Sequence, residues 1–229
     1  MTITTTTLSR AAGLCAVAGG LLYAGVQIAH PPVDAAFATT TEYTIRETVK
    51  IAMAVLSLVG ITGMYLRHAR QVGVLGLIGY LVFGAGYLAL LTVQVIGVFV
   101  LPSLIDTSPD YVDGVLAVAL GGRATTDIGA MNDFLHVGGG AYLVGGLLFG
   151  IAFFRAHALA RWAAALLALG AASSGLIPFL PMINFRLFAI PVAVAVAGLG
   201  YSLWREQRSQ PVRPRASADS SRLDPAGAR

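Results

Sequence analysis

The sequence predicts an all-α, polytopic membrane protein: a bundle of six transmembrane helices, with a short interfacial helix between the third and the fourth. Of the 229 residues, 56% are hydrophobic and only 11% are charged. Soluble domains carry about 25% charged residues, so most of the surface of this chain is expected to face lipid. The 27 glycines fit the same class, because small residues let helices pack closely in a bilayer.

Six apolar runs are long enough to cross a hydrocarbon core of about 30 Å, for which a helix needs about 20 residues. These runs cover residues 9–29, 45–66, 72–100, 132–154, 159–180 and 184–204. Between the third and fourth runs, residues 111–120 form an amphipathic segment that is too short to span and that two glycines follow. An interfacial or re-entrant helix is predicted there.

The chain is predicted to form one domain and a tail. Residues 1–206 contain all six runs and are assigned to the transmembrane domain. Residues 207–229 are rich in Pro, Ser and Arg and poor in apolar side chains, a composition that cannot bury a core. We predict that they form a disordered cytoplasmic tail.

The charged residues predict an orientation. Threading six helices in order places these arginines on one side: Arg10, Arg67, Arg70, Arg155, Arg161, Arg205 and Arg208. The opposite side holds the acidic residues Asp34, Glu42, Glu47, Asp106, Asp110, Asp113, Asp127 and Asp133. Because cytoplasmic loops carry the excess of Lys and Arg, both termini are predicted to be cytoplasmic.

The basic residues also indicate a source and exclude a class of partner. Lys50 is the only lysine, which together with the abundance of Ala, Gly and Val indicates a high-GC bacterial genome. We therefore predict a multi-pass protein of the bacterial inner membrane. The net charge of +4 is spread over helix ends and the tail, so it serves as a topology signal and predicts no nucleic-acid surface.

Four segments carry a resemblance to a known group of proteins. They are Arg10–Leu14, Gly19–Gln27, Gly145–Ala152 and Arg161–Leu167. With these segments the chain resembles small integral membrane proteins of high-GC bacteria, most of unassigned function, and the resemblance implies six helices across nearly the whole membrane region. In size and helix count the chain is also similar to bacterial membrane-bound terpene cyclases, an analogy at the level of the fold.

Polar side chains inside the apolar runs gather in the predicted outer half of the bundle, and polar groups in a bilayer often mark functional sites. The first three runs place them at helical spacings on one face each: Tyr23, Gln27 and His30; Glu42, Arg46 and Lys50, with Glu47 nearby; and Tyr80, Tyr87 and Gln94. The fourth and sixth runs begin with Asn132, Asp133, His136, Asn184 and Arg186. If these faces converge, they line a polar cavity near the outer surface.

The first functional hypothesis is a membrane-embedded enzyme of the cyclase or isomerase type. Glu47, Asp133 and His136 are its predicted catalytic residues, because a carboxyl group kept protonated by an apolar wall can donate a proton to an alkene or epoxide of an isoprenoid-like substrate. Its predicted substrate-binding residues are Tyr23, Gln27, His30, Glu42, Arg46, Lys50, Tyr87, Gln94, Asn132, Asn184 and Arg186. Such chemistry needs no cofactor and no metal.

Two other functions use the same residues differently. A transporter or small-molecule-binding protein would hold a polar solute in the cavity, with Arg46, Lys50 or Arg186 engaging an anion. An accessory or structural subunit would have no site and would pack its glycine-rich faces within the chain or against a partner. The expected partners are membrane lipid, a lipophilic small molecule and a second copy of the chain.

Local explanations compete with the functional ones. Glu42 with Arg46, and Glu47 with Lys50, have the spacing of intrahelical ion pairs, and Asp133 suits the first turn of a helix. Asp133 and His136 together with His30 or Glu47 would suit a divalent ion, and His30 with His136 a haem. We favour the hypothesis without metal or haem. His68 and His157 lie among inner arginines and are interpreted as interfacial.

Overall fold

The computed structural model describes residues 4–28, 31–175 and 189–208, and these ranges contain helices and turns but no strands. The helices are α1 (Thr5–Val26), α2 (Ala35–Ala38), α3 (Thr41–Phe99), α4 (Leu101–Leu104), α5 (Pro109–Ala119), α6 (Ala130–Ala156), α7 (Arg161–Ser174) and α8 (Ala189–Arg208). The predicted all-α class is confirmed. Of these helices, α1, α3 and α6 are long and apolar enough to cross a membrane.

Helix α3 contains both the second and the third apolar runs. It is 59 residues long and is interrupted at Gly73, whose backbone angles are φ 59° and ψ −154°. Side chains with a Cβ atom are strongly disfavoured in that region of backbone space, whereas glycine adopts it freely. Residues 67–71, which lie between the second and third predicted runs, are therefore helical, and the chain reverses at a single glycine.

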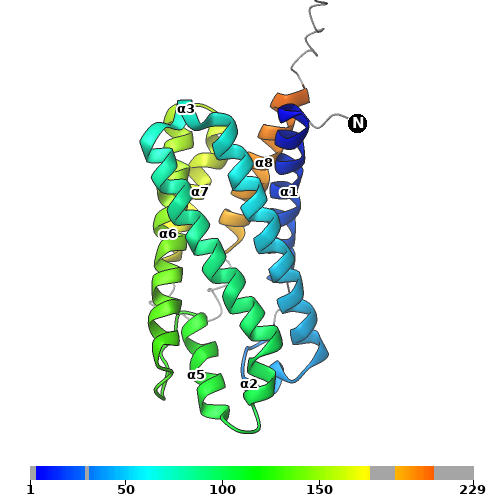
Figure 1. Cartoon of the computed structure of the whole chain (residues 1–229), viewed down its shortest axis with the longest axis vertical. Coiled ribbons are helices and arrows are strands. Elements are labelled where there is room, and N and C mark those ends of the chain that lie inside the picture. Colours follow the sequence, from blue (N-terminus) through cyan, green and yellow to red (C-terminus); the bar gives the residue numbers. More distant parts are fainter. Residues whose placement is uncertain (1–3, 29–30, 176–188, 209–229) are drawn as a thin grey trace, which may run out of the picture.

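The reversal divides α3 into two arms that lie against each other (Figure 1). The rings of Tyr65 and Tyr80 stack across the two arms with their centroids 4.6 Å apart. The hydroxyl groups of Thr62 and Tyr80 are 3.2 Å apart, within hydrogen-bonding distance. These contacts join residues on opposite sides of Gly73 and fix the arms as an antiparallel pair.

The long helices close into a ring. Helix α1 packs against α8 and α3, α6 packs against α3 and α7, and α7 packs against α8. The short helices α2 and α5 lie together at one end of the bundle, whereas the α3 reversal and the start of α1 lie at the other end (Figure 1). Asp113 of α5 ties α2 and α5 together, since its carboxylate accepts a hydrogen bond of 2.9 Å from the Ala35 amide.

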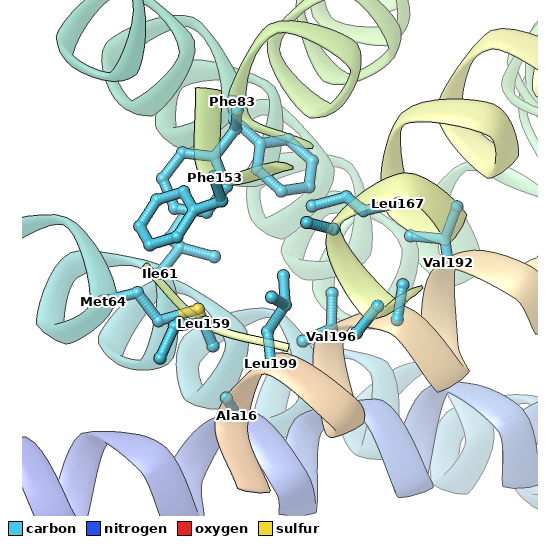
Figure 2. Packing of buried hydrophobic residues seen from close by; sticks show 14 of the residues in the cluster. Ala16, Ile61, Met64, Phe83, Phe153, Leu159, Leu167, Val192, Val196 and Leu199 are labelled. Atoms are coloured by element: carbon cyan, nitrogen blue, oxygen red, sulfur yellow. The ribbon is translucent and has the colours of Figure 1, made fainter. Parts of the chain in front are cut away.

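The core fills the centre of this ring. Figure 2 shows Phe83 of α3, Phe153 of α6, Leu167 of α7 and Leu199 of α8 meeting there, and each of these side chains is fully buried. Helices α3 and α6 approach so closely that glycine is required at the contact. A Cβ atom added to Gly145 would lie 2.2 Å from the Phe83 amide nitrogen.

The outer surface of the ring is apolar. Large aliphatic side chains on each of the long helices α1, α3, α6 and α7 are more than half exposed, among them Leu21, Leu66, Val74, Leu88, Val137 and Leu169. Soluble monomers rarely expose contiguous apolar surface on this scale. The periphery is therefore compatible with a lipid environment.

At the end of the bundle that holds the α3 reversal, a buried polar cluster joins α3 to α8. His68 is 3% exposed, and its ring nitrogens lie 3.0 Å from the Met64 carbonyl oxygen and 3.0 Å from a carboxylate oxygen of Glu206. Arg67 and Gln207 contact the other oxygen of Glu206 at 3.5 Å and 3.2 Å. His68 is thus a buried link between two helices, which its position among interfacial arginines did not reveal.

Replacing Glu206 with Ala is expected to destabilise the protein by about 1–3 kcal/mol, because it leaves a buried ring nitrogen of His68 without its partner. Unfolding of the purified protein in mixed micelles measures the change. Glu42→Ala is the control, since that carboxylate is 53% exposed in its ion pair with Arg46, and its loss should cost under about 1 kcal/mol. Equal losses for the two variants would contradict the importance of burial at His68.

Candidate binding cavity

A half-open cavity of about 550 Å³ is lined by residues from the end of the bundle that holds α5. Helices α1, both arms of α3, α5 and α6 supply most of its wall, and the end of α7 and the start of α8 contribute as well. Much of the wall is aliphatic and includes Val93, Leu101, Val115, Leu116 and Leu143. Six of the residues predicted to form a site are also part of the wall: Tyr23, Gln27, Glu47, Lys50, Gln94 and His136.

The charged residues of the wall form an ion pair within one helix. The Nζ atom of Lys50 lies 2.5 Å from Oε1 of Glu47, one turn earlier in α3, and their side chains are only 18% and 6% exposed. The other carboxylate oxygen of Glu47 faces Gly97 on the second arm of α3. A Cβ atom at Gly97 would lie 3.0 Å from the Tyr43 hydroxyl and 3.8 Å from this oxygen, so glycine leaves room for both polar groups.

His136 is held in one orientation by its own helix. Its Nδ1 atom lies 2.7 Å from the Asn132 carbonyl oxygen, which only accepts hydrogen bonds, so Nδ1 carries the proton and Nε2 of the neutral ring is an acceptor. His136 also lines a second cavity of about 270 Å³, whose wall includes Arg123, Asp127 and Asn132. His136, which is exposed, therefore borders both cavities.

Other predicted site residues lie outside the main cavity. Asp133 is exposed, and its carboxylate is 3.5 Å from the Asn132 side-chain amide. The Arg46 guanidinium bonds to Glu42 at 2.8 Å and to the Val26 carbonyl at 3.3 Å, so it ties α3 to the end of α1. His30, Asn184 and Arg186 lie outside the described residues.

The structure thus brings two of the three predicted catalytic residues together. Glu47 and His136 line the same cavity, whereas Asp133 does not. Within the described ranges, no group of three or more His, Cys, Asp or Glu side chains is arranged to hold a metal ion. The polar groups that share the main cavity are a neutralised ion pair, amides, hydroxyls and one imidazole.

A cluster of tyrosines forms the deep end of the cavity, toward the centre of the bundle. Tyr23 of α1 and Tyr142 of α6 line it, and Tyr87 of α3 is fully buried behind them. The rings of Tyr87 and Tyr142 meet edge to face with their centroids 5.3 Å apart, and Phe83 packs against both. Sequence analysis missed Tyr142, although it follows Gly139 by three residues and so shares its helical face.

The cavity is the feature from which a function for the chain is inferred. Comparison with protein-family models, with curated proteins and with solved structures found no match for the chain.

Proposed function

We propose that the chain is a six-span membrane protein that binds a lipophilic small molecule in the cavity between its helices. The observation that supports this proposal most directly is the cavity. Its volume of about 550 Å³ falls within the range of about 300–1,000 Å³ of known small-molecule sites. Those sites combine apolar walls with a few polar groups that orient the ligand, and the wall described above has this composition.

The lengths of the helices support six spans. At about 1.5 Å per residue, the 59 residues of α3 measure about 90 Å, three times the hydrocarbon core of about 30 Å. The reversal at Gly73 converts this length into two spans. Together with α1, α6 and the 20-residue α8 they give five helices of spanning length. We count α7 as the sixth span, although its 14 residues measure only about 21 Å, because the apolar run 159–180 continues beyond it in the sequence. The positive-inside tendency then favours a cytoplasmic location for the arginine-bearing end of the bundle.

An acid–base enzyme is the second candidate, and one observation favours it: Glu47 and His136 line the same cavity. The ion pair with Lys50 opposes it, because Oε1 of Glu47 already contacts the Lys50 ammonium group at 2.5 Å, and a carboxylate in an ion pair accepts hydrogen bonds and does not donate them. Asp133, the other predicted carboxyl group, is exposed and does not line the cavity. The geometry of the cavity therefore agrees better with ligand binding than with proton donation by Glu47. A transporter would also need to bind its solute in this cavity.

Filling the cavity tests the proposal. Gly139 lines the cavity, and a Cβ atom there would meet nothing within 4 Å, so Gly139→Leu should occupy the space without disturbing the helix. The full-length protein is purified in mild detergent, and the small molecules that co-purify with it are identified and quantified by mass spectrometry. We expect Gly139→Leu to retain less than about a tenth of the wild-type amount of a specific lipophile, a loss of about 1.4 kcal/mol in binding.

The control is Gly25→Leu, at an exposed glycine of α1 that is likewise free of neighbours within 4 Å and does not line the cavity. It should retain the wild-type amount, and both variants should match the wild type in thermal stability. Equal amounts of every co-purifying molecule in all three proteins would contradict a role for the cavity.

A further inference from the structure

The end of the bundle that holds the α3 reversal is strongly basic (Figure 1). Contacts between helices bring α3, α6, α7 and α8 together there. The His68 ring of α3 lies 5.8 Å from the Phe153 ring of α6, and the Ala160 amide before α7 donates a 3.0 Å hydrogen bond to Ser202 of α8. Among the described residues at this end, Glu206 is the only acidic one. Seven exposed arginines, which we call the arginine rim, lie at this end: Arg10, Arg67, Arg70, Arg155, Arg161, Arg205 and Arg208.

Most of the rim is not neutralised by the described part of the chain. Glu206 is already shared by Arg67 at 3.5 Å and His68 at 3.0 Å. Within the described ranges, no ion pair is formed by Arg10, Arg70, Arg155, Arg161 or Arg208. Residues 209–229, which lie outside those ranges, contain four arginines and two aspartates, so by composition they add positive charge and cannot cancel that of the rim.

Two guanidinium groups of the rim lie on aromatic rings. The Cζ atom of Arg161 is 4.5 Å from the centre of the Phe154 ring, and that of Arg208 is 4.7 Å from the centre of the Trp204 ring. The face of an aromatic ring attracts a cation but does not neutralise its charge. A guanidinium group positioned in this way keeps a planar array of N–H donors, which suits the oxygen atoms of a phosphate group.

Exposed apolar and aromatic side chains lie beside the rim in the sequence and in the structure. Leu66 is 69% exposed, Trp162 is 58% exposed and Tyr201 is 53% exposed. Trp and Tyr are enriched at the interface between membrane and water. A soluble polyanion would pair with the arginines but leave these apolar side chains in water, whereas a phospholipid offers a phosphate to the first and acyl chains to the second. The combination therefore favours a lipid over a nucleic acid or an acidic protein.

We infer that the arginine rim binds the head groups of acidic phospholipids, and that Arg155 and Arg161 at the turn between α6 and α7 make the main contact. Both arginines are close to Phe154, since Arg155 follows it in the chain and Arg161 lies over its ring. The inference goes beyond the proposed ligand binding, because the rim is at the other end of the bundle from α5 and the main cavity. The two proposals share only the membrane location.

Two lipids with the same acyl chains test the inference: anionic phosphatidylglycerol and zwitterionic phosphatidylcholine. The full-length protein in mild detergent is titrated with each lipid, and the bound lipid is counted by native mass spectrometry. The wild type should bind phosphatidylglycerol more tightly. The double variant Arg155→Gln with Arg161→Gln should weaken this binding roughly five- to 25-fold, about fivefold for each arginine near an anionic head group, and leave phosphatidylcholine binding unchanged.

Three further measurements separate a lipid contact from a structural role or a general effect of charge. Arg123→Gln is the matched control, because Arg123 is exposed and lies between α5 and α6 at the other end; it should leave the binding of both lipids unchanged. Arg155→Lys with Arg161→Lys keeps the charge and should retain most of the preference. Raising the salt from 0.1 M to 1 M should reduce the preference, since the screening length falls from about 10 Å to about 3 Å.

The outcomes separate this inference from the cavity function. Equal affinities of the wild type for the two lipids would overturn the inference, and so would equal losses in the Arg123→Gln and the double glutamine variants. Complete displacement of phosphatidylglycerol by polyglutamate at the same concentration of charge would make the rim a docking site for acidic protein and the lipid assignment wrong. Gly139→Leu should leave phosphatidylglycerol binding unchanged even where it removes the ligand of the cavity, so either proposal can fail alone.

Discussion

Replacing Lys50 with Met is expected to destabilise the protein by about 3–5 kcal/mol, one of the two largest effects that the structure predicts. The change leaves the carboxylate of Glu47 buried, 6% exposed, without its counter-charge. Removing one partner of a buried ion pair has this effect because the remaining charge is desolvated and uncompensated. Equilibrium unfolding in mixed detergent micelles measures the loss.

The double variant Glu47→Leu with Lys50→Met shows whether the lone charge is the cause. Removing both charges should restore most of the stability, since a buried ion pair and apolar residues of similar volume are often equally stable. A single Lys50→Met variant that loses less than about 1 kcal/mol would mean that Glu47 is well hydrated, in contradiction to its burial between the two arms of α3.

Gly145→Ala is expected to have an effect of similar size, about 3 kcal/mol, although it adds only one methyl group. The new Cβ atom would lie 2.2 Å from the Phe83 amide nitrogen and 2.4 Å from its Cα. Backbone atoms cannot move aside as a flexible side chain does, so α3 and α6 must separate and lose their packing. Overpacking of well-packed contacts typically destabilises by about 1–3 kcal/mol, and a clash with the backbone lies at the upper end.

Gly84→Ala is the matched control for this prediction. Gly84 is next to Phe83 on α3, but a Cβ atom there would meet nothing within 4 Å. Alanine should therefore stabilise the helix by about 0.5–1 kcal/mol through its higher helix propensity. Opposite signs for the same substitution at these two positions would confirm the close approach of α3 and α6, and equal effects would contradict it.

Elements that depend on local pattern were predictable from the sequence. The amphipathic segment 111–120 corresponds to α5 (Pro109–Ala119), and each apolar run overlaps a helix of the structure. The reversal of α3 was not predicted as such, because residues 67–71 were left outside the apolar runs 45–66 and 72–100 although they contain no helix breaker. A single glycine with a positive φ angle, Gly73, makes the turn in place of a loop. The sequence alone does not distinguish such a glycine from a glycine within a continuous helix.

The candidate site was predictable only in part. Glu47, Lys50 and Gln94 were found because polar residues in apolar runs stand out. Tyr142 was missed because one tyrosine in an apolar helix is typical of packing, and its place in the cavity wall depends on how α1 and α3 pack beside α6. Asp133 precedes His136 by one turn and both are exposed, yet only His136 lines the cavity, a difference that depends on how neighbouring helices pack against α6.

The closed ring has a consequence for the order in which the protein assembles during synthesis. Helix α1 is made first and α8 last among the described helices, yet the two pack side by side. Until α8 leaves the ribosome, the face of α1 that carries Gly13 and Gly20 lacks its contacts with Gly200 and Ala193. The two arms of α3, whose contacts are close in sequence, can pair early. The packing of α8 against α1 and α7 is therefore the last step that completes the ring of described helices.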